Sequence, residues 1–210
     1  MTIETLNLGV CMTNCYLASA DGVHCVIVDP AADGKAIYAK ICQHGWIPDA
    51  ILLTHAHFDH ISGLSELNKA IGNNHLPVIL HEDEVFMLTD TTCNLSGLLF
   101  GTPFVYNGTV HPVTDGDTLH AGGTTFRVLH TPGHTSGSVC YVCDTETLIF
   151  SGDTLFASTI GRTDFPGGDT QTLLRSLQML KTLPDDYTVY PGHNAPTTLL
   201  REKQYNEFLQ

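Results

Sequence analysis

Metal-ligating side chains are concentrated in one short segment of the chain, Thr54–His60. This segment directly follows the apolar run 50–53, which predicts a buried strand that ends in a loop, where chemistry is usually placed. Four ligand candidates lie within six residues: His55, His57, Asp59 and His60. The first two histidines are two residues apart, so in extended backbone they point the same way. The aspartate and the third histidine come where the chain enters an apolar helical pattern. One segment can therefore supply two clusters of ligands.

Three more ligand candidates share a common context, because each directly follows a glycine that ends an apolar run: His134, Asp153 and His193. A glycine lets the backbone approach a crowded site without a Cβ clash. Asp29 also ends an apolar run, and two interpretations remain open: it accepts the free N–H of a ligating imidazole, or it caps the next turn. The remaining histidines lack the glycine context, and we expect structural or surface roles for His24, His44, His75, His81, His111, His120 and His130.

Seven ligands suit two metal ions rather than one. Zinc takes about four ligands, and a catalytic zinc keeps one position for water. Two ions ~3.5–4 Å apart can share a carboxylate. The expected partition is His55, His57 and His134 on one ion and Asp59, His60 and His193 on the other, with Asp153 bridging. Zinc is the first candidate metal, and iron and manganese are compatible with the same donors.

Alternating strand and helix patterns must position these residues. In the first half, strands are predicted at 3–9, 14–20, 24–29, 50–53 and 78–80, and helices at 36–41, 61–72 and 82–89. In the second half, strands are predicted at 124–130, 138–143, 147–151 and 187–190, with a helix from the N-cap Asp169 to Pro184 and a polar final helix. No linker divides the halves. We therefore expect one domain over 1–210, an α/β (α+β) four-layer sandwich with two sheets face to face and helices outside.

The segment 91–109 interrupts this pattern. It is a long connection that combines turn formers with large apolar side chains, which are costly to leave in water: Leu95, Leu98, Leu99, Phe100, Phe104 and Tyr106. One interpretation is a loop packed on its own domain. The other is a flap over the site or a dimer contact, because large exposed apolar patches usually mark interaction sites.

Composition narrows the class of protein. The formal charge of −13, from 22 acidic and 9 basic residues, disfavours binding to nucleic acid and favours small-molecule substrates. Neither a signal peptide nor an apolar run of membrane-spanning length is apparent, so we expect a cytoplasmic location, no membrane partner, and a monomer or homodimer. The seven cysteines indicate reduced thiols. In a strand, Cys140 and Cys143 would face opposite sides, so their thiols would not converge. We interpret this pair as small apolar fillers, and Cys11 and Cys15 likewise.

At the seven ligand candidates the sequence resembles the metallo-β-lactamase-fold hydrolases, whose signature is H-x-H-x-D-H followed by separate His, Asp and His. Within that superfamily it looks most like glyoxalase II, the hydroxyacylglutathione hydrolases. The strings that carry this resemblance are 131–135 (TPGHT), 151–156 (SGDTLF) and 161–169 (GRTDFPGGD). The closing strings 191–193 and 206–209 resemble the short, single-domain YcbL-like bacterial branch. The chain ends 17 residues after His193, too soon for the C-terminal region with which longer glyoxalase II enzymes hold glutathione.

The resemblance implies a metal-dependent hydrolase that cleaves small-molecule thioesters with a metal-bound hydroxide, with Asp59 and Asp153 as ligands that orient it. Arg162 stands where the family places a basic residue near the substrate, and it either pairs with a substrate carboxylate or is a structural arginine. The first rival is a persulfide dioxygenase with a single iron on the His55, His57 and Asp153 side. A lactone or other ester hydrolase is a further alternative, and a metal-storing scaffold is the non-enzymatic one.

Overall fold

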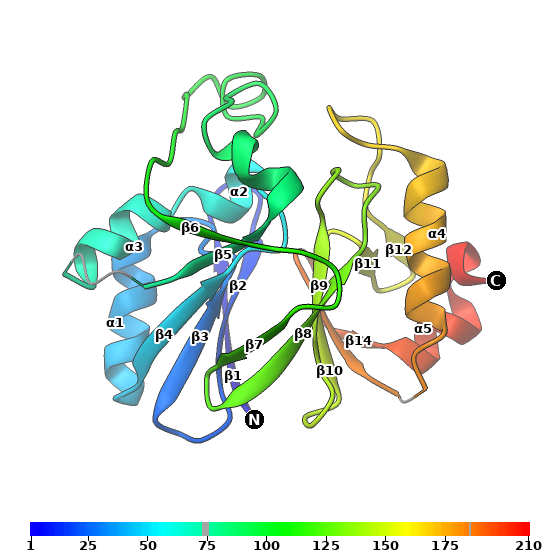
Figure 1. The fold of residues 1–210 in the computed structure, drawn as a ribbon, viewed down its shortest axis with the longest axis horizontal. Coiled ribbons are helices and arrows are strands. Elements are labelled where there is room, and N and C mark those ends of the chain that lie inside the picture. Colours follow the sequence, from blue (N-terminus) through cyan, green and yellow to red (C-terminus); the bar gives the residue numbers. More distant parts are fainter. Residues whose placement is uncertain (73–75, 185) are drawn as a thin grey trace.

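The protein is described by a computed structural model over residues 1–72, 76–184 and 186–210, in which two six-stranded sheets face each other (Figure 1). The first sheet runs in sequence order through β1 (Thr2–Leu8), β2 (Thr13–Ser19), β3 (His24–Val28), β4 (Ile47–Leu52), β5 (Val78–His81) and β6 (Val110–Val113). The second has the order β14 (Thr197–Thr198), β13 (Thr188–Pro191), β10 (Leu148–Gly152), β9 (Val139–Cys143), β8 (Thr124–His130) and β7 (Thr118–Ala121). A small hairpin pairs β11 (Leu155–Phe156) with β12 (Thr159–Ile160).

Helices cover the outer faces of the two sheets (Figure 1). They are α1 (Gly34–His44), α2 (Phe58–Ile61), α3 (Leu64–Ala70), α4 (Thr170–Lys181) and α5 (Leu199–Tyr205), with 3₁₀ turns η1 (Glu82–Leu88) and η2 (Glu207–Leu209). The Asp169 carboxylate caps α4 by accepting the Thr172 N–H at 2.7 Å, as its position before the leucine pattern predicted. In the described ranges, no helix is long and apolar enough to cross a membrane.

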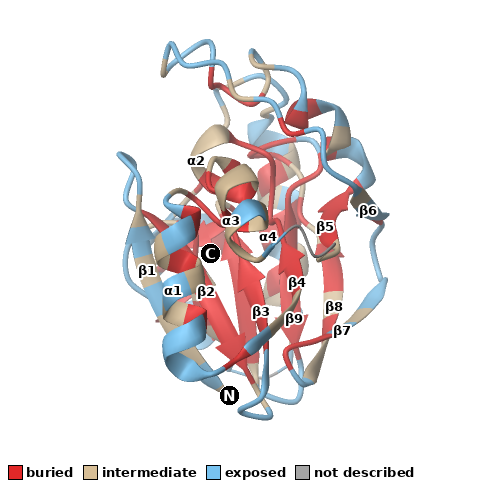
Figure 2. Ribbon diagram, turned by 90° about the vertical axis from the view of Figure 1, so that its left-hand side faces the viewer, coloured by how far each residue is buried: buried red, intermediate tan, exposed pale blue. Residues whose placement is uncertain are grey.

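Within the part of the chain that the structure describes, three apolar clusters hold the layers together. One lies between the sheets and contains the buried rings of Phe126, Tyr141 and Phe150. A second packs α1 and α3 on the first sheet, and a third packs α4 and α5 on the second. Each fully buried Leu, Ile, Val or Phe side chain in these clusters contributes about 1.5–3 kcal/mol to the stability of the fold. Figure 2 shows the consequence, buried strands behind helices whose outer faces are exposed. The predicted four-layer α/β arrangement is confirmed.

The ends of particular strands place the ligand loops at one edge of the sandwich. β3 is parallel to β4, and β10 is parallel to β13, so the carboxyl ends within each pair meet at the same edge. Hydrogen bonds between the two sheets also hold the ligand loops there. The Val139 N–H donates to the Thr54 carbonyl and the Tyr141 hydroxyl donates to the Leu53 carbonyl, both at 2.9 Å. The loop after β4 is thereby fixed to the second sheet.

Several predicted elements need correction. The helix expected over 61–72 is divided into α2 and α3 by Gly63, which lies so close to the chain that a Cβ there would be 2.6 Å from the Pro30 carbonyl oxygen. The helix expected at 82–89 is a 3₁₀ helix. β6, β7, β14 and the β11–β12 hairpin were not predicted, since runs of two to four residues give almost no periodicity.

The 91–109 loop packs largely on its own domain. Phe104 and Tyr106 join the cluster on the first sheet, and the Phe100 ring lies 4.9 Å from that of Phe58. Leu98 and Leu99 are 56% and 52% exposed, so these two apolar side chains of the loop are not packed on the domain.

The cysteine pairs behave differently from each other. Cys140 belongs to the cluster beneath α4 and Cys143 to the cluster between the sheets, so the two thiols lie on opposite faces of β9 as predicted. Cys15 is buried, but Cys11 is exposed. The interpretation of Cys11 as an apolar filler is therefore wrong.

Candidate metal centre

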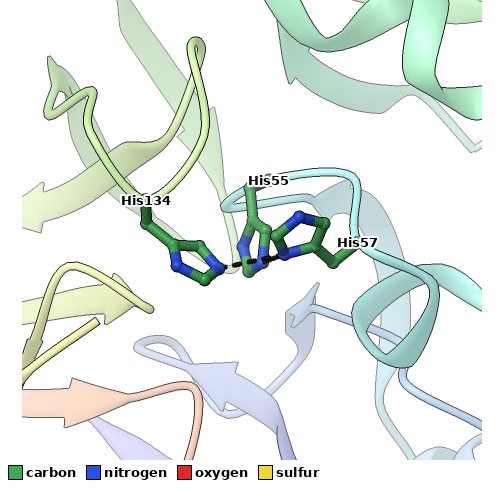
Figure 3. A group of neighbouring side chains, drawn as sticks. All are labelled: His55, His57 and His134. Atoms are coloured by element: carbon green, nitrogen blue, oxygen red, sulfur yellow. Dashed lines mark hydrogen bonds between the residues drawn. The ribbon is translucent and has the colours of Figure 1, made fainter. Parts of the chain in front are cut away.

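Three buried imidazoles converge at the first ligand cluster (Figure 3). His55 and His57 come from the loop after β4, and His134 comes from the loop between β8 and β9. The Nδ1 atom of His57 lies 3.1 Å from Nε2 of His55 and 3.0 Å from Nε2 of His134. Nitrogens bound tetrahedrally at ~2.0–2.1 Å from a zinc ion lie about 3.3 Å apart. The spacing of the three nitrogens thus matches one shared cation.

Neighbouring oxygens fix the tautomers of two of these rings. The Arg162 carbonyl accepts from Nδ1 of His134 at 2.7 Å, which leaves Nε2 with a free lone pair. The Thr54 hydroxyl donates to Asp29 at 2.7 Å and is therefore free to accept from Nδ1 of His55, 3.1 Å away. Both rings present an unprotonated Nε2 to the centre, the form that binds a metal.

Asp59, His60 and His193 form the second cluster. Nε2 of His193 lies 3.3 Å from Oδ2 of Asp59, and Nε2 of His60 lies 3.7 Å from the same oxygen. The Thr13 hydroxyl donates to that oxygen at 2.9 Å and holds the carboxylate in place. Asp29 accepts from Nδ1 of His60 at 2.9 Å, and it also accepts the Thr54 backbone N–H. The contact with His60 is the one expected of an imidazole partner, whereas the Thr54 N–H belongs to the loop after β4, 25 residues away, and not to the turn that follows Asp29.

Asp153 lies between the two clusters. Its Oδ2 is 3.6 Å from Nε2 of His134 and 3.5 Å from Nε2 of His193, and its Oδ1 is 3.4 Å from Nε2 of His60. This is the position of a bridging ligand. All seven predicted ligands therefore meet in one place, in three-residue groups whose ligand atoms lie within 4.8 Å of one another.

Unsatisfied buried atoms show that a cation fits this centre. Among the described residues, Nε2 of His60 and Oδ1 of Asp153 are buried without a hydrogen-bond partner. Buried polar atoms are seldom left in this state, because it costs about 1–3 kcal/mol each. Nε2 of His60 and Oδ1 of Asp153 face each other at 3.4 Å, and a metal ion between the clusters would satisfy both.

The electrostatic environment differs between the two clusters. Burial, reinforced by His134, lowers the pKa of His57 to about 3. Burial also opposes the charge on His60 and His193, but Asp59 and Asp153 outweigh it and raise their pKa values to about 9 and 10. In the ion-free protein the imidazoles of the first cluster are therefore neutral, and His60 and His193 of the second cluster are protonated. A cation entering the second cluster replaces those protons.

Arg162 contributes in two ways. Its carbonyl orients His134, while its guanidinium forms a bidentate pair with Asp164, with both N–O distances 2.7 Å. The guanidinium also lies 3.8 Å from the ring centroid of Phe165, whose ring meets His57 edge to face at 6.1 Å. Arg162 and Phe165 together form one wall of the centre. Only the side chain of Arg162 was considered in the sequence, so the role of its carbonyl was missed.

A cavity of about 500 Å³ opens beside the second cluster. Its lining includes Cys11, Asn14 and His193. The Asn14 amide donates to the carbonyls of Pro191 and Asn194, at 2.9 and 2.8 Å, and so anchors the loop that carries His193. Sequence reasoning missed both Asn14 and Thr13. The available signal was two polar residues at the start of an otherwise apolar strand.

Another group of ligand-type side chains lies outside the metal centre. His81 and His130 stack with their ring planes 14° apart and centroids 4.0 Å apart, next to Asp83. Imidazole lone pairs lie in the ring plane, so two parallel rings cannot direct them at one ion. The expected structural role fits His81, which caps η1 by accepting the Asp83 N–H at 3.3 Å. His75 lies outside the described residues.

We expect that Asp29→Asn weakens metal binding about 10–100-fold, the usual loss when the partner of a ligating histidine is removed. The amide keeps the shape of the carboxylate but places an N–H group toward either His60 or Thr54, which both donate to Asp29. Competition with a chromophoric zinc chelator measures the change. Unaltered affinity in a folded Asp29→Asn protein would contradict this role.

Comparison with known proteins identifies the family. Residues 8–193 match the model of the metallo-beta-lactamase superfamily. The chain belongs to that superfamily. Among its relatives is the "probable metallo-hydrolase YqgX" of Bacillus subtilis (strain 168), 40% identical over 100% of this chain and 98% of the relative. The "hydroxyacylglutathione hydrolase GloC" of Haemophilus influenzae is 31% identical over 100% of this chain and 98% of that protein.

Solved structures agree with this membership. The B3 metallo-beta-lactamase BLEG-1 superposes with a TM-score of 0.93 at 39% identity and covers all of both chains. TTHA1623, solved in a di-iron-bound form, gives a TM-score of 0.86 at 36% identity and covers 98% of this chain and all of its own. This protein is thus a metallo-hydrolase of the superfamily with a His and Asp centre suited to divalent metals.

Proposed function

We propose that this protein is a thioester hydrolase of the glyoxalase II type that works with two divalent metal ions, zinc being the first candidate. The observation that carries the proposal is the position of Asp153 between two complete ligand clusters. Two clusters support two ions rather than the single iron of a persulfide dioxygenase. The full-length likeness to GloC supports a thioester as the substrate class.

The residues of the chain prepare the centre in three ways. Asp29 and the Arg162 carbonyl hold the Nδ1 protons of His60 and His134, which keeps each Nε2 available. Thr13 fixes the Asp59 carboxylate. Two ions bound there would supply a hydroxide nucleophile at neutral pH and polarise a carbonyl oxygen. A thiolate is a good leaving group, so no strong general acid is required from the protein.

Arg162 is the proposed contact for a substrate carboxylate. Its Nε and Nη2 atoms are paired with Asp164, and the Nη1 donors of the fork are not used by that pair. The guanidinium is half exposed beside Phe165, on the wall of the centre. A carboxylate of an acyl-thiol substrate can therefore bind to Nη1 while the Asp164 pair stays intact.

A metal analysis combined with a substrate panel tests the proposed function. We expect two equivalents of metal per chain, cleavage of S-lactoylglutathione or another acyl thioester, complete loss of activity after chelation, and recovery on adding zinc, iron or manganese. One equivalent of iron with oxygen consumption on a persulfide would contradict it.

A second candidate is β-lactam hydrolysis, which the likeness to BLEG-1 along both entire chains favours. The same metal centre would serve, because both reactions need a nucleophile and a polarised carbonyl. A chromogenic cephalosporin belongs in the panel for this reason. A kcat/KM for it above that of every thioester would replace the thioester proposal with this one.

A further inference from the structure

Glu84 is a fully buried carboxylate on η1 that the proposed reaction does not use. Its named partners are neutral. Oε2 accepts the Ala56 N–H at 2.9 Å, Oε1 accepts the Gly137 N–H at 2.8 Å, and the Thr135 side chain also bonds to it. Burying an ionisable carboxyl is costly, and burial raises its pKa. A carboxylate in such a place needs a reason beyond filling space.

The positions of these partners supply the reason. Ala56 is the residue between His55 and His57, and Thr135 and Gly137 belong to the loop that carries His134. One carboxylate therefore joins the two loops that supply all three nitrogens of the first cluster. Those nitrogens lie 3.0–3.1 Å apart, a spacing that depends on how the loops are held together.

The chemistry of the contact requires a carboxylate. Both of its oxygens accept, so it can face two backbone N–H groups at once. A glutamine has one acceptor oxygen, and its NH₂ group would face one of the two N–H donors. The space is equally specific, because a Cβ on Gly137 would come 2.7 Å from Cγ of Glu84.

We propose that Glu84 is a positioning residue of the metal centre, which holds the Ala56 peptide and the Gly137 turn at the separation that makes the three histidine nitrogens converge. The proposal deepens the proposed hydrolase and rests on its metal centre. It does not depend on the identity of the substrate.

The test compares Glu84→Gln with Glu202→Gln by metal binding and without substrate. Glu202 is also fully buried and accepts a backbone N–H, from Ser158 at 2.7 Å, and a hydroxyl, from Thr197 at 2.6 Å, although Arg201 adds a cation. None of its partners adjoins a metal ligand. We expect about 10–100-fold weaker zinc binding at one site in Glu84→Gln, and an altered absorption spectrum of the Co²⁺-substituted protein. Glu202→Gln should keep both properties while its apo Tm falls comparably.

Unchanged zinc affinity and an unchanged Co²⁺ spectrum in folded Glu84→Gln, with only a lower Tm, would overturn the proposal. Glu84→Asp provides a second variant if the glutamine protein does not fold. It keeps two acceptor oxygens but is one methylene shorter, so it cannot span both N–H groups, and an intermediate loss of affinity is expected. Native affinity in that variant would equally reject the role. Because these readouts use metal alone, a failure to cleave thioesters would reject the proposed function and leave this proposal standing.

Discussion

An Asp153→Asn protein is expected to lose at least about 10³-fold in kcat while remaining folded. The carboxylate lies within 3.4–3.6 Å of ligating nitrogens from both clusters, so its charge serves both metal positions. Asparagine offers one neutral oxygen and an NH₂ group that cannot bind a metal. Losing ~4 kcal/mol of the several kcal/mol that a metal contributes to transition-state stabilisation corresponds to about 10³ in rate. Steady-state kinetics on the thioester that the panel identifies, with metal content measured on the same sample, checks the result.

Asp49→Asn is the matched control for that experiment. Asp49 accepts the Gly122 N–H with both oxygens at 3.1 Å and does not belong to either ligand cluster. The Asp49→Asn protein should have a metal content and a turnover near those of the unchanged protein. If the Asp153→Asn protein retained two metals and more than a tenth of its activity, this result would contradict the bridging role of Asp153.

The ligands were predictable because their signal is local. Most of them stand in loops that follow strands, while Asp59 and His60 come where the loop after β4 enters α2. The Gly residues before His134, Asp153 and His193 mark close backbone approach. Strand ends converge at one edge when the strands are parallel, so correct strands were enough to bring the ligands together. The same reasoning gave the four layers, because the apolar runs and helical patterns of both halves are strong.

The residues that support the ligands could not be predicted, because their partners are distant in the sequence. Thr13 donates to Asp59 across 46 positions, and Gly137 donates to Glu84 across 53. In the sequence, Glu84 belongs to the acidic run 82–84, which is typical of a solvated face. Its burial follows only from the packing of η1 against both ligand loops. The break at Gly63 has the same origin, since it reflects contact with Pro30 rather than any local helix signal.

A Gly192→Ala protein is expected to bind metal poorly and to lose at least about 10²-fold in activity. An added Cβ would lie 2.2 Å from Oδ1 of Asp153 and 2.7 Å from Cε1 of His60, distances that real Cβ atoms do not adopt. His60 is held by Asp29, and the Gly192 backbone is held by hydrogen bonds to Gly152 and Asn14. The bridging carboxylate or the imidazole must therefore move, and a misplacement of about 1 Å can cost 10²-fold.

Gly45→Ala separates this steric effect from the usual cost of replacing a glycine. Gly45 has a φ of 69° at the end of α1, and no atom of the described residues lies within 4 Å of its missing Cβ. Gly192 does not have a positive φ, but its missing Cβ has no room. Alanine at 45 should cost about 1–2 kcal/mol of stability through backbone strain and leave metal binding and turnover unchanged. Alanine at 192 should do the reverse, with metal affinity falling far more than apo stability. Equal metal affinities in the two proteins would show that the 192 backbone yields, and that the crowding around Asp153 does not determine how the bridging ligand is placed.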